Sequence, residues 1–183
     1  MSLPVKVSRA PRPLTDGEVR EARQVAQWSV AHGRFAAAWA LAETTARSGE
    51  IAEIRWRDVD LSAGEVRLPG VGKVRARVGK LTDWGVTTLR HLPRQTGHQS
   101  VRVVYAGNVP ASGGSASASN AVSTVLIRAG LAGRRDVRPG SVVAWAAQQR
   151  MIATGDIGEV ARMLGVGSLD VAARTIGWDW TRG

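Results

Sequence analysis

The chain has 183 residues, with 25 lysines and arginines against 15 acidic residues, and a formal net charge of +10 at pH 7. This length can bury a core, and we expect one principal domain. The absence of cysteine excludes disulfides and thiolate metal sites, and with no leader pattern and no apolar run of membrane-spanning length we expect a cytoplasmic protein with no membrane partner.

The excess of basic charge favours a polyanionic partner, with nucleic acid as the first candidate. All but three of the 25 basic residues are arginines, whose guanidinium groups can hold two phosphate oxygens at once. A G·C-rich genome would also favour arginine over lysine. That alternative explains the ratio of the two residues better than the excess over acidic residues.

Residues 1–13 contain Lys6, Arg9, Arg12 and several prolines. This composition predicts an extended basic arm that either contacts phosphates or serves as a linker. The principal domain is then expected at 14–183.

Thr15 and Glu18 have the spacing of a capping box, which predicts that a helix begins here. A second helix is expected over the alanine-rich, apolar stretch 35–41, which has the composition of a buried helix. Ser48 is placed to cap a third, short helix. Arg47 is therefore expected at a junction between two packed helices.

The sequence around this junction is TTARSGEIAEIRWRDVD. It resembles the first signature of the tyrosine recombinase (phage integrase) family, which runs T-G-L-R-x-G-E and ends in W-x-D-I/V-D. The resemblance begins near Pro13 and covers most of the chain. It implies a mainly α (α+β) fold with about seven helices and a small antiparallel sheet of about three strands. It also implies that Arg47 is the family's first catalytic arginine, which grips the scissile phosphate; the alternative is a helix-end arginine that pairs with Glu50.

Residues 65–68 and 73–78 alternate as strands do, around a turn rich in proline and glycine. On the second strand Lys73, Arg75 and Arg77 are expected to share one face, where they can lie along a phosphate backbone. The alternative is a solvated sheet face. By resemblance, Lys73 is the nearest match to the lysine that the family's hairpin presents to DNA at the cleavage site.

The next helix is expected to begin at Thr82 or Asp83 and to end before Pro93. Residues 101–105 predict a short strand, and residues 106–118 predict a flexible loop because they are rich in glycine, serine and alanine.

Ser119 and Asn120 are expected to cap the helix that follows this loop. A basic turn carries Arg134, Arg135 and Arg138, which are candidate phosphate contacts. Three further helices are expected at 141–154, 157–164 and 169–176, the last two capped by Asp156 and Ser168.

The family's late motifs supply a histidine and a second arginine, then a histidine or tryptophan, and finally the nucleophilic tyrosine. Their scaffold is recognisable here, but the reactive side chains are absent. The four matching positions hold Gly140, Val143, Val166 and Thr175. The last histidine, His98, and the only tyrosine, Tyr105, both precede this segment. Because most of these replacements are apolar, we expect the late pocket to pack as core.

Together with the resemblance, these patterns imply a catalytically inactive DNA-binding protein, without metal or cofactor, that regulates or assists recombination or integration of a mobile element. One alternative is an active recombinase with Thr175 or Tyr105 as a relocated nucleophile. Another is an interaction module whose tail, 177–183, docks onto a second copy or onto an active recombinase through Trp178 and Trp180.

Overall fold

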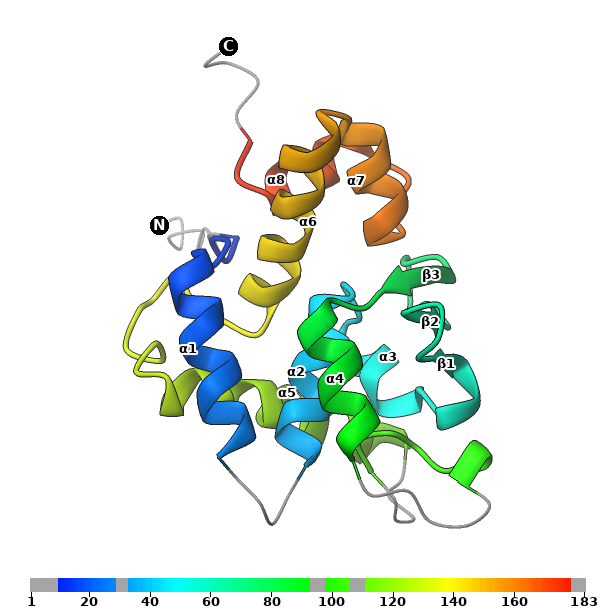
Figure 1. The fold of residues 1–183 in the computed structure, drawn as a ribbon. Coiled ribbons are helices and arrows are strands. Elements are labelled where there is room, and N and C mark those ends of the chain that lie inside the picture. Colours follow the sequence, from blue (N-terminus) through cyan, green and yellow to red (C-terminus); the bar gives the residue numbers. More distant parts are fainter. Residues whose placement is uncertain (1–9, 29–32, 93–97, 106–110, 179–183) are drawn as a thin grey trace, which may run out of the picture.

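The computed structural model describes residues 10–28, 33–92, 98–105 and 111–178. These residues form eight α-helices and one three-stranded antiparallel sheet (Figure 1). The helices are α1 (Asp16–Gln27), α2 (Arg34–Glu43), α3 (Ser48–Glu53), α4 (Asp83–His91), α5 (Ala111–Arg128), α6 (Gly140–Thr154), α7 (Ile157–Leu164) and α8 (Leu169–Thr175). The strands are β1 (Val59–Asp60), β2 (Glu65–Leu68) and β3 (Arg77–Lys80), and two 3-10 turns lie at Trp56–Asp58 and His98–Ser100. The predicted fold class is confirmed.

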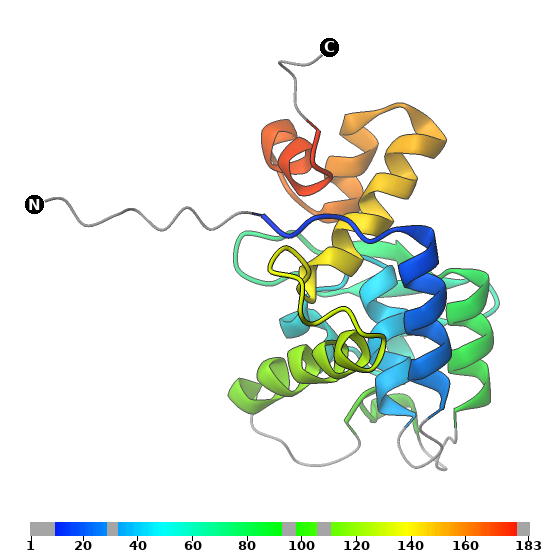
Figure 2. The same ribbon diagram turned by 90° about the vertical axis from the view of Figure 1, so that its left-hand side faces the viewer.

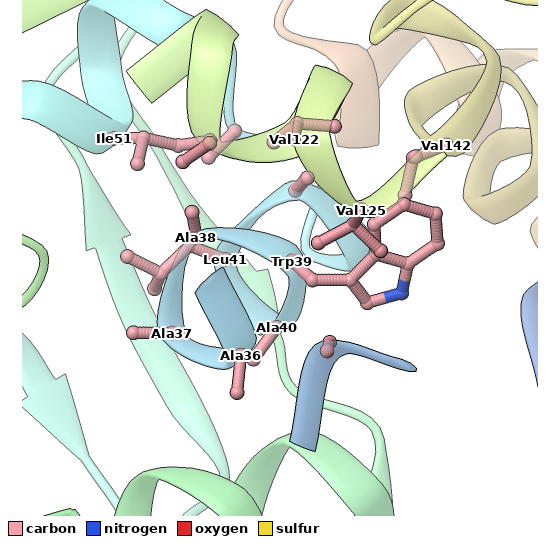
Figure 3. Packing of buried hydrophobic residues seen from close by; sticks show 14 of the residues in the cluster. Ala36, Ala37, Ala38, Trp39, Ala40, Leu41, Ile51, Val122, Val125 and Val142 are labelled. Atoms are coloured by element: carbon pink, nitrogen blue, oxygen red, sulfur yellow. The ribbon is translucent and has the colours of Figure 1, made fainter. Parts of the chain in front are cut away.

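Helix α2 is the centre of the main core, and every residue from Phe35 to Glu43 is buried. Helices α1, α4, α5 and α6 all contact it, and Figure 2 shows α1, α2 and α4 side by side with α5 lying across them. Figure 3 shows Trp39 packed beside Val125 of α5 and Val142 of α6. The alanines of α2 allow its neighbours to approach closely, so this helix can be surrounded on all sides.

One carboxylate, that of Glu43, lies inside this core with its side chain fully buried. It accepts hydrogen bonds from Arg23 Nε at 2.8 Å and from Trp39 Nε1 at 2.8 Å. Thr82 Oγ1 donates to its second oxygen at 2.7 Å. A buried charge is tolerated only with such partners, and these bonds tie α1 and the start of α4 to the end of α2.

The sheet has the strand order β1-β2-β3, with Val66 opposite Gly79. A Cβ at Gly79 would lie 2.9 Å from the carbonyl oxygen of Thr44. This position therefore requires glycine, because β3 passes directly over the end of α2.

Helix starts with a clear local signal lie where the sequence predicts them. The capping box of Thr15 and Glu18 is formed at α1. Side chains of Thr82, Asp156 and Ser168 cap α4, α7 and α8, respectively. Ser48 is the first residue of α3 instead of its cap, which is Arg47.

Two predictions about the middle of the chain are wrong. Residues 101–105 form no strand; Arg102 makes only an isolated bridge with Arg55. Helix α5 begins at Ala111, so most of the predicted flexible loop is helical, while residues 106–110 lie outside the described residues. A Cβ at Gly114 would lie 3.1 Å from the Cβ of Ala52, so packing of α5 on α3 outweighs the low helix propensity of glycine and serine.

The C-terminal helices have a second, smaller hydrophobic cluster of their own. Its buried members are Ala147, Val160, Ala161, Leu164, Ala172 and Ile176. In Figure 1 helix α7 lies above the sheet with α8 beside α6, and α7 contacts β3. Among the described residues, no helix has the length and apolar character needed to cross a membrane.

Candidate nucleic-acid interface

A pocket of about 360 Å³ lies where the junction of α2 and α3 faces α6 and α8. Its lining comes from five helices and the segment before α1. The lining residues are Ala10, Pro11, Ala42, Ala46, Arg47, Ser48, Ile51, Val122, Pro139, Gly140, Val143, Val171, Arg174 and Thr175.

The fold brings four of the predicted site positions together in this pocket: Arg47, Gly140, Val143 and Thr175. They come from the α2–α3 junction, α6 and α8, which are distant in the sequence. Val166 is not part of the lining and packs instead against the C-terminal hydrophobic cluster. The prediction that the late pocket packs as core is thus wrong for Gly140, Val143 and Thr175, which line a pocket, although Val143 also packs against that cluster.

Arg47 is the N-cap residue of α3, with an extended backbone. Its backbone N–H donates to Glu50 Oε2 at 2.9 Å, whereas its side chain is exposed and lines the pocket. Within the described ranges, the Arg47 guanidinium has no carboxylate partner. The alternative in which Arg47 is tied to Glu50 by a side-chain ion pair is therefore wrong.

The partner of Glu50 is Arg77, at 2.7 Å between Nη1 and Oε1. The Arg77 side chain is only 7% exposed and that of Glu50 is fully buried. Arg77 also donates from Nε to the carbonyl oxygen of Met163 at 2.7 Å and from Nη2 to that of Thr45 at 2.8 Å. Arg77 therefore connects β3, the junction of α2 and α3, and the end of α7.

The prediction that Lys73, Arg75 and Arg77 share one face of a strand is wrong. The second strand begins only at Arg77, because Val71 and Val74 close a tight turn by bonding each other's backbone groups. Lys73 and Arg75 precede the strand and are exposed, whereas Arg77 points into the protein.

Thr45 has a left-handed backbone, with φ 71°, which is uncommon for a β-branched residue. Its hydroxyl donates to the carbonyl oxygen of Met163 at 2.8 Å, the same oxygen that Arg77 uses. Nearby, Arg75 N–H donates to the carbonyl oxygen of Gly165 at 2.9 Å. These polar contacts hold the end of α7 and the turn after it against the α2–α3 junction and the segment that leads into β3.

No protein-family model matches this sequence, and no curated protein matches it. Solved structures do match in fold. XerA recombinase has 17% identity and a TM-score of 0.69 over 98% of this chain and 63% of that chain. A lambda integrase dimer bound to a COC' core site has 19% identity and a TM-score of 0.68, over 94% and 51%. The integrase from mycobacterium phage Brujita has 23% identity and a TM-score of 0.62, over 97% and 60%.

This chain has the catalytic-domain fold of the tyrosine recombinases. It spans between half and two thirds of the length of these solved chains. The pocket described above contains four of the positions that sequence reasoning matched to the family's motifs, Arg47, Gly140, Val143 and Thr175.

On the recombinase fold, the predicted basic turn lies beside α1. Arg134 Nη1 contacts Glu18 Oε1 at 2.9 Å, and Arg12 contacts the same oxygen at 2.6 Å. Hydrogen bonding from Arg12 is the main reason that the pKa of Glu18 falls from 4.5 to about 2. Arg135 and Arg138 are exposed.

Of the predicted arm, residues 1–9 lie outside the described residues. Arg12 is bound to the domain, because it pairs with Glu18 and also contacts Asp136 at 3.2 Å. Sequence reasoning missed these contacts, because the composition of the arm does not reveal that it packs against Glu18, six residues away, or Asp136, far along the chain.

The two hydroxyls considered as relocated nucleophiles have different surroundings. Thr175 Oγ1 donates to the carbonyl oxygen of Val171 at 2.8 Å, a bond within its own helix. Tyr105 is 8% exposed and is not part of the pocket lining. The described residues contain no cluster of side chains able to hold a metal ion.

Proposed function

We propose that this chain is a DNA-binding protein with a recombinase-type catalytic domain that has no strand-transfer activity. We further propose that it regulates or assists recombination or integration of a mobile element. The observation that carries the proposal is the pocket, in which Arg47 has no acidic partner among the lining residues and the lining residues Gly140 and Val143 have no reactive side chain.

Phosphate contact is supported by charge. The net charge is +10, and the pocket lining includes Arg47 and Arg174 but no aspartate or glutamate. The exposed Lys73, Arg75 and Arg138 extend this basic character beyond the pocket. Among the structures of similar fold, XerH is bound to its difH substrate and the Tn1549 integrase is in complex with transposon right-end DNA, which supports the same class of partner here.

The absence of strand transfer is supported by chemistry. Transesterification at phosphorus needs a nucleophile and donors for the negative charge that builds on the non-bridging oxygens. Gly140 and Val143 have no side-chain donor. Thr175 has a hydroxyl, but it donates to the carbonyl of Val171 and has no base among the residues that line the pocket.

Binding is tested by titrating a fluorescent DNA duplex at several salt concentrations. We expect the logarithm of the affinity to fall linearly with the logarithm of salt, by about 0.9 for each phosphate contacted. Arg47→Ala should weaken binding and reduce that slope by about one. Arg90→Ala is the matched control, because Arg90 is exposed on α4, which is not part of the pocket lining. A titration that shows no salt dependence would contradict the proposal.

Catalysis is tested separately with nicked suicide substrates, which trap a covalent protein–DNA adduct when a recombinase cleaves. We expect no adduct from the wild-type chain under conditions in which DNA is bound. An adduct that disappears in Thr175→Ala or Tyr105→Phe would refute the inactive assignment and identify the nucleophile.

Self-association is part of the same proposal. Lambda integrase forms a dimer on its core site and a tetramer on a Holliday junction. Here Trp178, near the start of the tail, is 46% exposed, while residues 179–183 of the predicted docking tail lie outside the described residues. Light scattering of the wild type against a chain ending at Ile176 should show a smaller particle for the shorter chain; equal masses would exclude the tail as the contact.

A further inference from the structure

The pocket beside Arg47 has the size of a ligand site. Its volume of about 360 Å³ lies within the range of small-molecule pockets, which begins at about 300 Å³. Of the residues that α6 contributes to the lining, Gly140 has no side chain and Val143 has a short one; a Cβ at Gly140 would lie 3.1 Å from Cγ of Pro11.

The walls of this pocket are mainly apolar. The apolar lining residues are Ala10, Pro11, Ala42, Ala46, Ile51, Val122, Pro139, Val143 and Val171. They come from several elements and enclose a concave surface that water hydrates poorly. A phosphate group held at Arg47 has no apolar surface of its own to cover these walls.

The charged side chains that line the pocket are all positive. Arg47 and Arg174 are the charged lining residues, and both are exposed. Ser48 and Thr175 supply hydroxyls, and none of the described lining residues is acidic. A ligand with an apolar body and one anionic head would satisfy both the walls and the guanidinium groups.

We propose that this pocket binds a small amphipathic anion, with an apolar body against Val122 and Val143 and a carboxylate, sulfonate or phosphate head at Arg47. Since Arg47 is the proposed phosphate contact, the bound anion excludes DNA from that position. This second step rests on the proposed function and makes DNA binding sensitive to the ligand.

The probe is 1-anilinonaphthalene-8-sulfonate, which combines two aromatic groups with one sulfonate and fluoresces when it leaves water. N-phenyl-1-naphthylamine has the same apolar body without the charge. We expect saturable binding of the sulfonate at one site. Arg47→Gln should weaken the sulfonate about tenfold, the value of a charge-assisted hydrogen bond, and should change binding of the neutral amine less than twofold.

Val143→Phe should fill the pocket and reduce binding of both probes at least tenfold. Ile152→Phe is the control, because Ile152 lies on the same helix and is 72% exposed outside the pocket. Val171→Phe fills the pocket from α8 and replaces the first variant if Val143→Phe does not melt cooperatively. Sulfonate binding that survives a folded, filled variant would overturn the site, and equal loss of both probes in Arg47→Gln would overturn the anionic head.

The link to DNA is measured on the same proteins. Saturating sulfonate should weaken DNA binding by the wild type about tenfold. The DNA affinity of Val143→Phe should be the same with and without the sulfonate. Probe binding without an effect on DNA affinity would overturn the exclusion step alone. A wild-type chain that binds the probe but no DNA would refute the proposed function while leaving the pocket assignment standing.

Discussion

The ion pair of Glu50 and Arg77 should be a major determinant of stability, and Glu50→Leu tests it. The Glu50 carboxylate is fully buried and has four donors. Oε1 accepts from Arg77 Nη1 at 2.7 Å and from the N–H of Gly70 at 3.0 Å. Oε2 accepts from the N–H of Arg47 at 2.9 Å and from Arg77 Nη2 at 3.1 Å.

The magnitude follows from what the substitution leaves behind. In Glu50→Leu the Arg77 side chain, which is 7% exposed, loses its counter-charge and keeps only neutral oxygen partners, namely backbone carbonyls and the Thr45 hydroxyl. Removing one member of a buried pair costs about 3–5 kcal/mol. At about 2–4 °C per kcal/mol for a domain of this size, the melting temperature should fall by roughly 10 °C.

The assay is equilibrium urea unfolding of Glu50→Leu, Arg77→Met and the double variant. The free energy of unfolding of the double variant should fall by less than the sum of the two single decreases, because neither charge is left unpaired in it. Glu65→Ala is the control; its exposed pair with Lys80 should contribute at most about 1 kcal/mol. If Glu50→Leu cost no more than Glu65→Ala, or if the two single losses were additive, the reasoning would be refuted.

Two further predictions concern acid stability and a helix end. Because hydrogen bonding to Arg12 lowers the pKa of Glu18 from 4.5 to about 2, its contribution to stability is present above pH 4.5 and is lost as the pH falls toward 2. The melting temperature of Glu18→Gln should therefore fall less than that of the wild type between pH 4.5 and 2. Equal falls in the two proteins would count against the pairing of Glu18 with Arg12. Gly165→Ala should destabilise more than Gly155→Ala, although both glycines have positive φ of 68° and 64°, because only at Gly165 would a Cβ lie 2.8 Å from the Arg75 carbonyl oxygen. Gly155→Ala should cost about 1–2 kcal/mol, and equal losses in chemical denaturation would contradict the docking of α7.

Sequence reasoning succeeded where a few neighbouring residues decide the structure. Thr15 with Glu18, Thr82, Asp156 and Ser168 each cap a helix within their own turn, and such contacts are visible in the sequence. The first half of α5 could not be predicted, because glycine and serine weaken a helix that only its packing on α3 stabilises.

In the candidate site, too, local sequence predicted some features and long-range packing decided the others. Arg47 could be located from its local motif, and the late positions Gly140, Val143 and Thr175 from their spacing, and the fold brings all four together. The depth of the remaining cavity could not be predicted, since it depends on how closely α6 and α8 approach the α2–α3 junction. The burial of the Arg77 side chain could not be predicted either. Alternation of polar and apolar residues begins at residue 73, and it does not reveal that the strand starts only at Arg77.

The ion pair of Arg77 with Glu50 has a consequence for Arg47. Glu50 stands three residues after Arg47 and is the nearest carboxylate in the sequence, so local reasoning makes it the natural partner of that guanidinium. In the fold Arg77 and two backbone N–H groups use all the acceptor positions of Glu50. Arg47 therefore contacts Glu50 through its backbone alone, and its positive charge stays directed at the pocket. The long-range ion pair is thus what leaves the local arginine available to an anion.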